Sequence, residues 1–205
     1  MRLLFAALAI AIPFFGVIDA RAASVTRSYS YFSIGGTTMQ DLQQELVARG
    51  PMVQSSGQRH AGATQMQFVD KVRFSQAGGK CRISSASVTV KARIILPRWT
   101  RRGSGSDETR LIWDTLSADI KRHEENHVSI ARRHAREMEL ALLAMPPQHD
   151  CAAVTARGRE AMAQQMKRHD AEQARFDVIE GRNFGKRLDR LIRLRVENGR
   201  AADPD

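Results

Sequence analysis

The hexapeptide at residues 122–127 reads Arg-His-Glu-Glu-Asn-His and lies inside a long run of residues with helical periodicity. It matches the pattern H-E-x-x-H, in which two histidines four residues apart emerge from one face of a helix. Neutral imidazoles at this spacing can bind one Zn²⁺ at about 2.0–2.1 Å. The pattern predicts that His123 and His127 are zinc ligands. It also predicts that Glu124 is a general base that accepts a proton from water.

Both histidines belong to the apolar stripe of the expected helix. The stripe recurs at helical spacing and consists of Ile112, Leu116, Ile120, His123, His127, Ile130, Ala131, His134, Met138 and Leu142. An imidazole that points into apolar surroundings without a partner costs free energy. The placement therefore favours a metal site over a solvated helix face whose histidines bind nothing.

The motif does not supply the third zinc ligand. His134 follows His127 on the same helix, about 10 Å further along, which is too far for both to bind one ion. In metzincins a glycine breaks the helix after the second histidine, but no glycine lies between these two residues. We therefore interpret His134 as a satisfied or surface-edge histidine.

A second helix, antiparallel to the first, can bring a third ligand to the same level. If the turn between the helices centres near Gln148, His169 comes level with His127. With a later start of the second helix, Asp177 and Glu180 come level instead. A good N-cap residue directly before the helix favours the early start, so we predict His169 as the third ligand and Glu180 as the alternative. The competing interpretations are a core histidine bonded to a neighbour and a glutamate paired with an arginine.

Residues 1–22 have the pattern of a cleavable signal peptide. Arg2 supplies the positive n-region, residues 3–17 are mostly apolar, and residues 20–22 form a small-x-small cleavage site. The apolar run is short for a membrane span, which disfavours an uncleaved anchor. We expect a mature chain that starts at Ala23 and lies in the periplasm or outside the cell.

Cys81 and Cys151 are the two cysteines of the chain. In an oxidising compartment an even pair predicts a disulfide. A bridge that closes a loop of about 70 residues would stabilise the fold by roughly 4 kcal/mol through the entropy of the unfolded chain. Their wide spacing makes the alternative role, as zinc ligands, less favoured.

The pattern of the remaining chain predicts an α+β fold. Residues 23–100 should form a β-rich lobe, a small antiparallel sheet with one helix over residues 39–49. Residues 107–198 should form a helical metal-binding lobe. We expect its helices over 107–144, 151–180 and 183–197, the last two separated by a glycine. A disordered tail is expected over residues 199–205.

The net charge of +10 admits three interpretations. An exported basic protein can contact anionic envelope surfaces peripherally, or the arginines can be a solvated face. The third is nucleic-acid binding. It is disfavoured because of the export signal, and because the sequence lacks the aromatic residues, interleaved with basic ones, that stack on bases.

Further motifs follow along the mature chain. They are Tyr29-Ser30-Tyr31-Phe32, Gly35, Thr37, Gly50-Pro51, Cys81, Leu96-Pro97-Arg98-Trp99, Trp113, Cys151 and Phe176-Asp177. Together with residues 122–127, they make the chain similar to a bacterial family known as predicted secreted zinc-dependent proteases, whose function is otherwise unknown. The resemblance implies an exported, zincin-like metallohydrolase with His123 and His127 as zinc ligands and Glu124 as base.

One stretch departs from the pattern of that family. Many members carry Tyr-Asp-x-x-Thr-x-His-Gly near the end of the helix that follows the H-E-x-x-H helix. Here residues 176–183 read Phe-Asp-Val-Ile-Glu-Gly-Arg-Asn. Arg182 stands at the position of the histidine and cannot bind zinc. If that histidine is a ligand elsewhere, this chain needs another one.

Two functions are compatible with these observations. The first is an exported zinc hydrolase, most simply a peptidase that acts on a peptide or cell-envelope substrate, with Glu124 as general base. The second is a non-enzymatic envelope protein with a structural or vestigial zinc site. Three protein ligands favour the enzyme, whereas a closed set of four favours the structural site.

Overall fold

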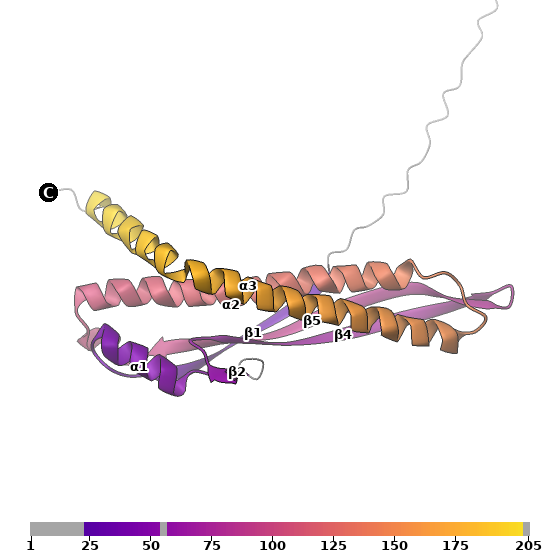
Figure 1. The fold of residues 1–205 in the computed structure, drawn as a ribbon, viewed down its shortest axis with the longest axis horizontal. Helices are drawn as coiled ribbons and strands as arrows, with labels where there is room; N and C mark the ends of the chain where they lie inside the picture. The colour runs from indigo at the N-terminus through magenta and orange to yellow at the C-terminus, as the bar shows by residue number, and fades with distance from the viewer. Residues whose placement is uncertain (1–22, 54–56, 203–205) are drawn as a thin grey trace, which may run out of the picture.

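The computed structural model describes residues 23–53 and 57–202, so the predicted signal peptide over residues 1–22 lies outside the described part. A long three-stranded sheet is accompanied along its length by two long helices (Figure 1). The elements are β1 Ser24–Ile34, α1 Met39–Arg49, β2 Met52–Val53, β3 Gln58–Arg59, β4 Ala63–Ala77, β5 Lys80–Trp99, a 3-10 turn Arg102–Ser104, α2 Asp107–Leu143 and α3 Cys151–Ala202. The expected α+β class is confirmed.

The sheet has the strand order β1-β5-β4. β4 and β5 form an antiparallel hairpin whose turn contains Gly78 and Gly79, both with positive φ, a conformation that favours glycine. β1, however, pairs parallel with β5, so the sheet is mixed rather than antiparallel as we predicted. The reason is that β5 carries the most apolar inward-facing residues of the three strands. The central position in the sheet buries these residues. β4 runs opposite to β1, so β5, which is antiparallel to β4, runs in the same direction as β1.

α2 covers one face of the sheet and shares a core with it. Val88 and Val90 of β5 pack in one buried cluster with Ala131, Ala135 and Met138 of α2. Burying these apolar side chains against each other stabilises both elements. The β-rich lobe and the helical lobe that we expected therefore form one packed body.

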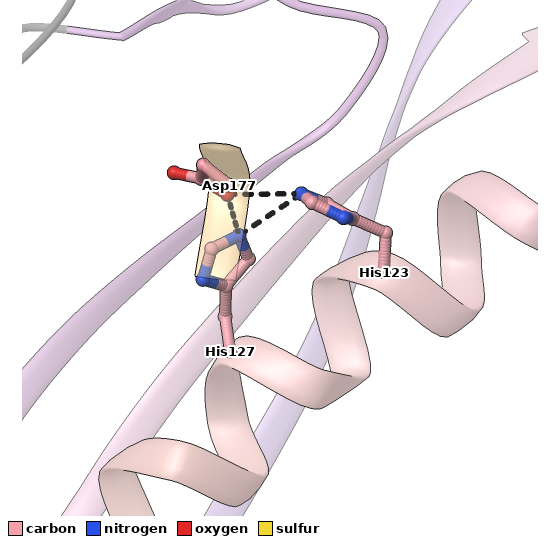
Figure 2. Close-up of side chains that lie close together, drawn as sticks. All are labelled: His123, His127 and Asp177. Carbon is pink, nitrogen blue, oxygen red and sulfur yellow. Dashed lines mark hydrogen bonds and ion pairs between the residues drawn. The ribbon is translucent and has the colours of Figure 1, made fainter. Parts of the chain in front are cut away.

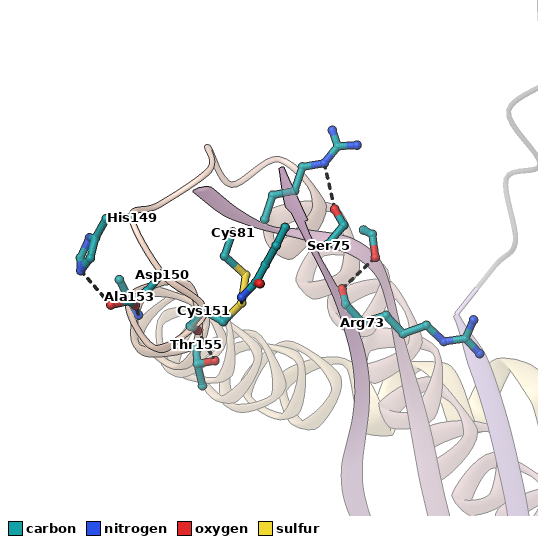
Figure 3. Close-up of a disulfide and its surroundings, with 11 residues drawn as sticks. Arg73, Ser75, Cys81, His149, Asp150, Cys151, Ala153 and Thr155 are labelled. Atoms are coloured by element: carbon teal, nitrogen blue, oxygen red, sulfur yellow. Dashed lines mark hydrogen bonds and ion pairs between the residues drawn. A yellow bond between two sulfur atoms is a disulfide. The ribbon is translucent and has the colours of Figure 1, made fainter. Parts of the chain in front are cut away.

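The predicted disulfide between Cys81 and Cys151 is confirmed (Figure 3). It joins the start of β5 to the first residue of α3, with 5.1 Å between the two Cα atoms. Two backbone hydrogen bonds between Cys81 and Gln148, of 2.9 and 2.8 Å, hold the α2–α3 turn against the same strand. The turn that sets the register of the two long helices is thus fixed at the hairpin end of the sheet.

α3 is a single helix over Cys151–Ala202 that passes through Gly181, so the break that we expected at this glycine is wrong. A glycine inside a helix costs only about 1 kcal/mol relative to alanine. Ion pairs to α2 on both sides of Gly181, from Glu180 and Arg187, offset this cost. Among the described helices, none is both long and apolar enough to cross a bilayer.

Candidate metal centre

Three potential metal ligands converge where α2 faces α3 (Figure 2). His123 and His127 come from neighbouring turns of α2, and Asp177 comes from α3. The Nε2 atoms of the two imidazoles are 3.1 Å apart. Asp177 Oδ1 lies 3.3 Å from Nε2 of His123 and 3.0 Å from Nε2 of His127. The motif therefore places both histidines as its spacing predicts.

The size of this triangle fits a metal ion. Donors that surround Zn²⁺ tetrahedrally with bonds of about 2.0–2.1 Å lie about 3.3 Å from one another. All three sides of the triangle lie close to that separation. The three donor atoms can thus occupy one face of a zinc coordination tetrahedron with little adjustment.

The protonation of His127 supports the same conclusion. Its Nδ1 lies 2.5 Å from the side-chain oxygen of Gln173, which can only accept a hydrogen bond, so Nδ1 carries the proton. In the neutral ring, Nε2 then presents its lone pair to the Asp177 carboxylate and to the other imidazole. Facing electron pairs repel unless a cation lies among them. The donor set therefore fits a cation.

The charges around the triangle are also those of a cation site. Burial alone would raise the pKa of Asp177, but its contacts with His123 and His127 hold that pKa well below its usual range. Burial likewise opposes protonation of His127, yet its bonds to Asp177 and Gln173 raise the pKa of the imidazole. In the absence of a metal, the Asp177 carboxylate favours a protonated, positively charged imidazole at His127. A divalent ion would compensate the negative charge of the carboxylate without protonation of the imidazoles.

Polar groups lie behind both imidazoles of the triangle, and a hydrogen bond from Gln173 orients that of His127. The amide nitrogen of Gln173 donates to the backbone oxygen of His127 at 3.1 Å. This glutamine therefore forms hydrogen bonds with both the ring and the main chain of His127. On the other side, Nδ1 of His123 lies 3.7 Å from Oε2 of Glu180. Metal-ligating histidines usually have such partners on their second nitrogen, where they fix the ring and its tautomer.

The two residues that we predicted as third ligands lie outside the triangle. His169 is buried, with Nδ1 at 2.9 Å from Asp170 and Nε2 at 2.8 Å from the amide nitrogen of Gln173. It thus supports Gln173 from behind. Glu180 forms ion pairs with Arg122 and, at 3.2 Å, with Arg187. Arg182, at the position of the family's histidine, is exposed.

The register of the two helices explains this arrangement. Near the site, each residue of α2 contacts a residue of α3 that lies as many residues after Asp150 as the first lies before it. This holds for His127 with Gln173 and for His123 with Asp177. Our prediction centred the turn two residues earlier. That difference moves the partner on α3 by four residues, or about one helical turn. Gln173 therefore occupies the level at which we expected His169.

Glu124 lies beside the triangle, buried between α2 and the start of β4. The Thr64 hydroxyl donates to its Oε2 at 2.7 Å. Gly62 leaves room for the carboxylate, because a Cβ there would come within 2.8 Å of its Oε1. Burial raises the pKa of Glu124, against the opposing effects of the Thr64 hydrogen bond and of the two histidines. A carboxylate with a raised pKa is better matched to proton transfer near neutral pH.

Two cavities meet at the site, since His123, Glu124 and Asp177 line both of them. One, of about 310 Å³, extends past Ile120 to Phe184 on α3. The other, of about 640 Å³, follows the first residues of β4 and the facing side of α3. His60 and Gly62 line both cavities as well, so together the cavities form one groove with these shared residues at its middle, and an extended ligand can lie across them.

Some of these residues could be identified from the sequence and others could not. Asp177 was visible as one of the residues that come level under a later helix start, and as part of the Phe176-Asp177 motif. Gln173 and Thr64 were not identified, because an amide and a hydroxyl carry no motif and because Thr64 lies 60 residues from Glu124 in the chain. Only knowledge of the helix register and of the neighbouring strand could have pointed to them.

Comparison with known protein families gives a match over most of the chain. The model of a family described as bacterial protein of unknown function (DUF922) matches residues 29–185. The matched range includes the whole triangle, Glu124 and both cysteines. No curated protein and no solved structure matches the chain.

Proposed function

We propose that this chain, which belongs to the bacterial DUF922 family of unknown function, is an exported zinc-dependent hydrolase and most simply a peptidase. The observation that carries the proposal is the triangle of His123, His127 and Asp177 with the buried carboxylate of Glu124 beside it. Sets of three protein ligands are typical of catalytic zinc sites, whereas structural sites usually have four. Among the described residues, the group that could hold a metal has three members.

Each residue has a separate role in the proposal. His123, His127 and Asp177 hold the ion, and Gln173 keeps the His127 ring in the tautomer that binds it. A bound Zn²⁺ supplies a Lewis acid for a carbonyl oxygen and lowers the pKa of water to about 7. Glu124 accepts a proton from the attacking water and returns it to the leaving amine. Thr64 holds one oxygen of that carboxylate, which leaves the other for the proton.

A peptide is the substrate that the shape of the groove favours. The start of β4 lines the larger cavity, and β5 is the one strand that pairs with β4 in the described part of the chain. An extended peptide can add to the other edge of β4 through main-chain hydrogen bonds. That arrangement would carry a scissile bond past Glu124 and the triangle.

Export is part of the proposal because of the disulfide. A bridge between Cys81 and Cys151 persists in oxidising compartments such as the periplasm or the extracellular space. It agrees with the predicted signal peptide. We therefore place the enzyme in the periplasm or outside the cell.

The experiment compares Glu124→Gln with a matched control, Glu125→Gln, in the purified mature chain. Glu125 is the exposed neighbour that bonds Tyr29. We expect about one zinc per chain in both variants, because neither glutamate is a ligand. Hydrolysis of a peptide library should fall by about 10²–10⁴-fold in Glu124→Gln and stay unchanged in Glu125→Gln.

Three results would contradict the proposal. Undiminished turnover in zinc-loaded Glu124→Gln would remove Glu124 from the mechanism. Iron instead of zinc would point to oxygen chemistry, since two histidines and one carboxylate also bind non-haem iron. Zinc in a wild type that cuts neither peptides nor isolated cell wall would support the non-enzymatic envelope protein.

A further inference from the structure

We propose that the sheet face turned away from the core binds an extended anionic polysaccharide. This outer face consists of the residues of β1, β4 and β5 that alternate with the buried ones, over residues 24–30, 65–75 and 80–93. It is separate from the groove that holds the candidate metal centre. The proposal therefore does not depend on the proposed function.

The outer face is strongly basic. Six exposed cations point from it, namely Lys71, Arg73, Lys80, Arg82, Lys91 and Arg93. The three strands contain one acidic residue, Asp70. It pairs with the buried Val88 and so belongs to the opposite side of the sheet. Among the described residues, no ion pair includes any of the six cations. Their positive charges are therefore available to an anionic partner.

Hydroxyl and amide groups fill the space between these cations. Ser24 and Thr89 share a hydrogen bond of 2.6 Å across β1 and β5, and Arg93 donates to Ser30 at 3.2 Å. Gln67 pairs with Lys91 in the next strand. An array of hydroxyls and amides suits the hydroxyl groups of sugars, and the cations beside it suit carboxylate or sulfate groups.

The length of the basic array indicates a polymer rather than a small anion. Along β5, the distance from Arg93 to Lys80 is about 40 Å at about 3.3 Å per residue. A small anion can contact two of these side chains at most. An extended chain with regularly spaced charges can contact all six, and the released counter-ions favour its binding.

The same face lacks what other polyanionic partners require. Binding in a membrane interface needs apolar side chains that enter the lipid, and the outer face has only the half-buried Val69 among its large apolar residues. Binding of single-stranded nucleic acid needs aromatic rings for stacking on bases. The exposed Tyr29, Tyr31 and Phe74 lie on the other side of the sheet, in register with the buried Ile94, Leu96 and Ile83.

The test uses heparin as the probe, with the variants Lys71→Gln/Arg73→Gln and Lys91→Gln/Arg93→Gln. The matched control is Arg190→Gln/Arg195→Gln on the exposed side of α3, which removes the same charge elsewhere. At about 0.1 M salt, each outer-face pair should weaken heparin binding about tenfold, and the control should change it by less than about twofold. Polygalacturonate should bind like heparin, and neutral dextran should not bind.

Equal losses in the control and the outer-face variants would show attraction to net charge without a site, and would overturn the proposal. So would binding of phosphatidylglycerol vesicles or single-stranded DNA in preference to both polysaccharides. Circular dichroism of each variant confirms that the fold is kept. If one pair fails to fold, the other pair gives the same comparison.

Discussion

At the disulfide end of the α2–α3 pair, the helices are joined to the sheet by a covalent bond and by apolar contacts among Cys81, Ile83, Leu142 and Val154. At the metal-centre end, the two helices are joined by ionisable and amide groups, with His127 against Gln173 and Glu180 against Arg122 and Arg187. The first end depends on redox state and the second on pH, and under the proposed function the second end also depends on a bound cation. The disulfide end should therefore stabilise the fold, whereas the other end should tune the site.

The largest effect should come from the disulfide end. Replacing both cysteines, Cys81→Ala/Cys151→Ala, should lower the free energy of unfolding by about 4 kcal/mol, because the unfolded chain regains the entropy of an open loop. Zinc content of the folded fraction should not change. Urea unfolding and elemental analysis measure the two quantities. Loss of zinc together with stability would mean that the two ends act as one unit.

The next effect concerns the third ligand. Asp177→Ala should weaken zinc binding more than the 10–100-fold typical of groups behind the ligands, because it removes a donor itself. His169→Ala should weaken it less, since His169 contacts Gln173 and not the triangle. Competition with a chromophoric chelator gives both affinities. A greater loss in His169→Ala would restore His169 as the ligand.

A smaller effect is expected for Gln173, which holds the ring and the main chain of His127. Gln173→Ala should weaken zinc binding about 10–100-fold. The control is Gln164→Ala, an exposed position on the same helix. Equal affinities in the two variants would mean that packing alone orients the imidazole.

The smallest effect should be a pH dependence of stability at the metal-centre end. Burial opposes ionisation of Asp119, but its bonds to Arg187 and Arg122 lower its pKa. The stabilisation is therefore present above the unfolded-state pKa of about 3.9 and is lost as the pH falls through and below that value. Asp119→Asn should cost about 1.5 kcal/mol at neutral pH and flatten this acid loss.

Asp114→Asn is the control for that measurement, because Asp114 forms an exposed pair with Arg102. Exposed pairs contribute little, so this variant should follow the wild type from about pH 5 to about pH 3. Unfolding followed by circular dichroism across that range decides the question. Parallel curves for wild type and Asp119→Asn would show that the Asp119 pairs do not contribute.

What could be predicted from the sequence was local. The helix over residues 39–49 was correct at both ends. The spacing of His123 and His127 placed both rings on one face because a helix repeats over short distances. The third member of the triangle depended on the length of a turn. With the turn centred two residues later than we expected, Gln173 instead of His169 lies level with His127, and Asp177 lies level with His123.

Pairings between distant parts of the chain were not visible in the same way. The parallel partner of β1 and the contact between Thr64 and Glu124 both join segments that local patterns treat separately. The continuity of α3 at Gly181 depended on ion pairs to α2 that periodicity does not reveal.

The strand order β1-β5-β4 also has a consequence for how the protein acquires its fold. β1 emerges first, but its partner β5 is the last strand to be made. Such non-local pairing slows folding, and until it forms, the unpaired edges of β1 can pair with strands of other chains and aggregate. The first half of β1 reads Ser-Val-Thr-Arg-Ser and is mostly polar. We expect that this polar composition keeps the unpaired segment soluble and lowers its tendency to aggregate until it pairs with β5.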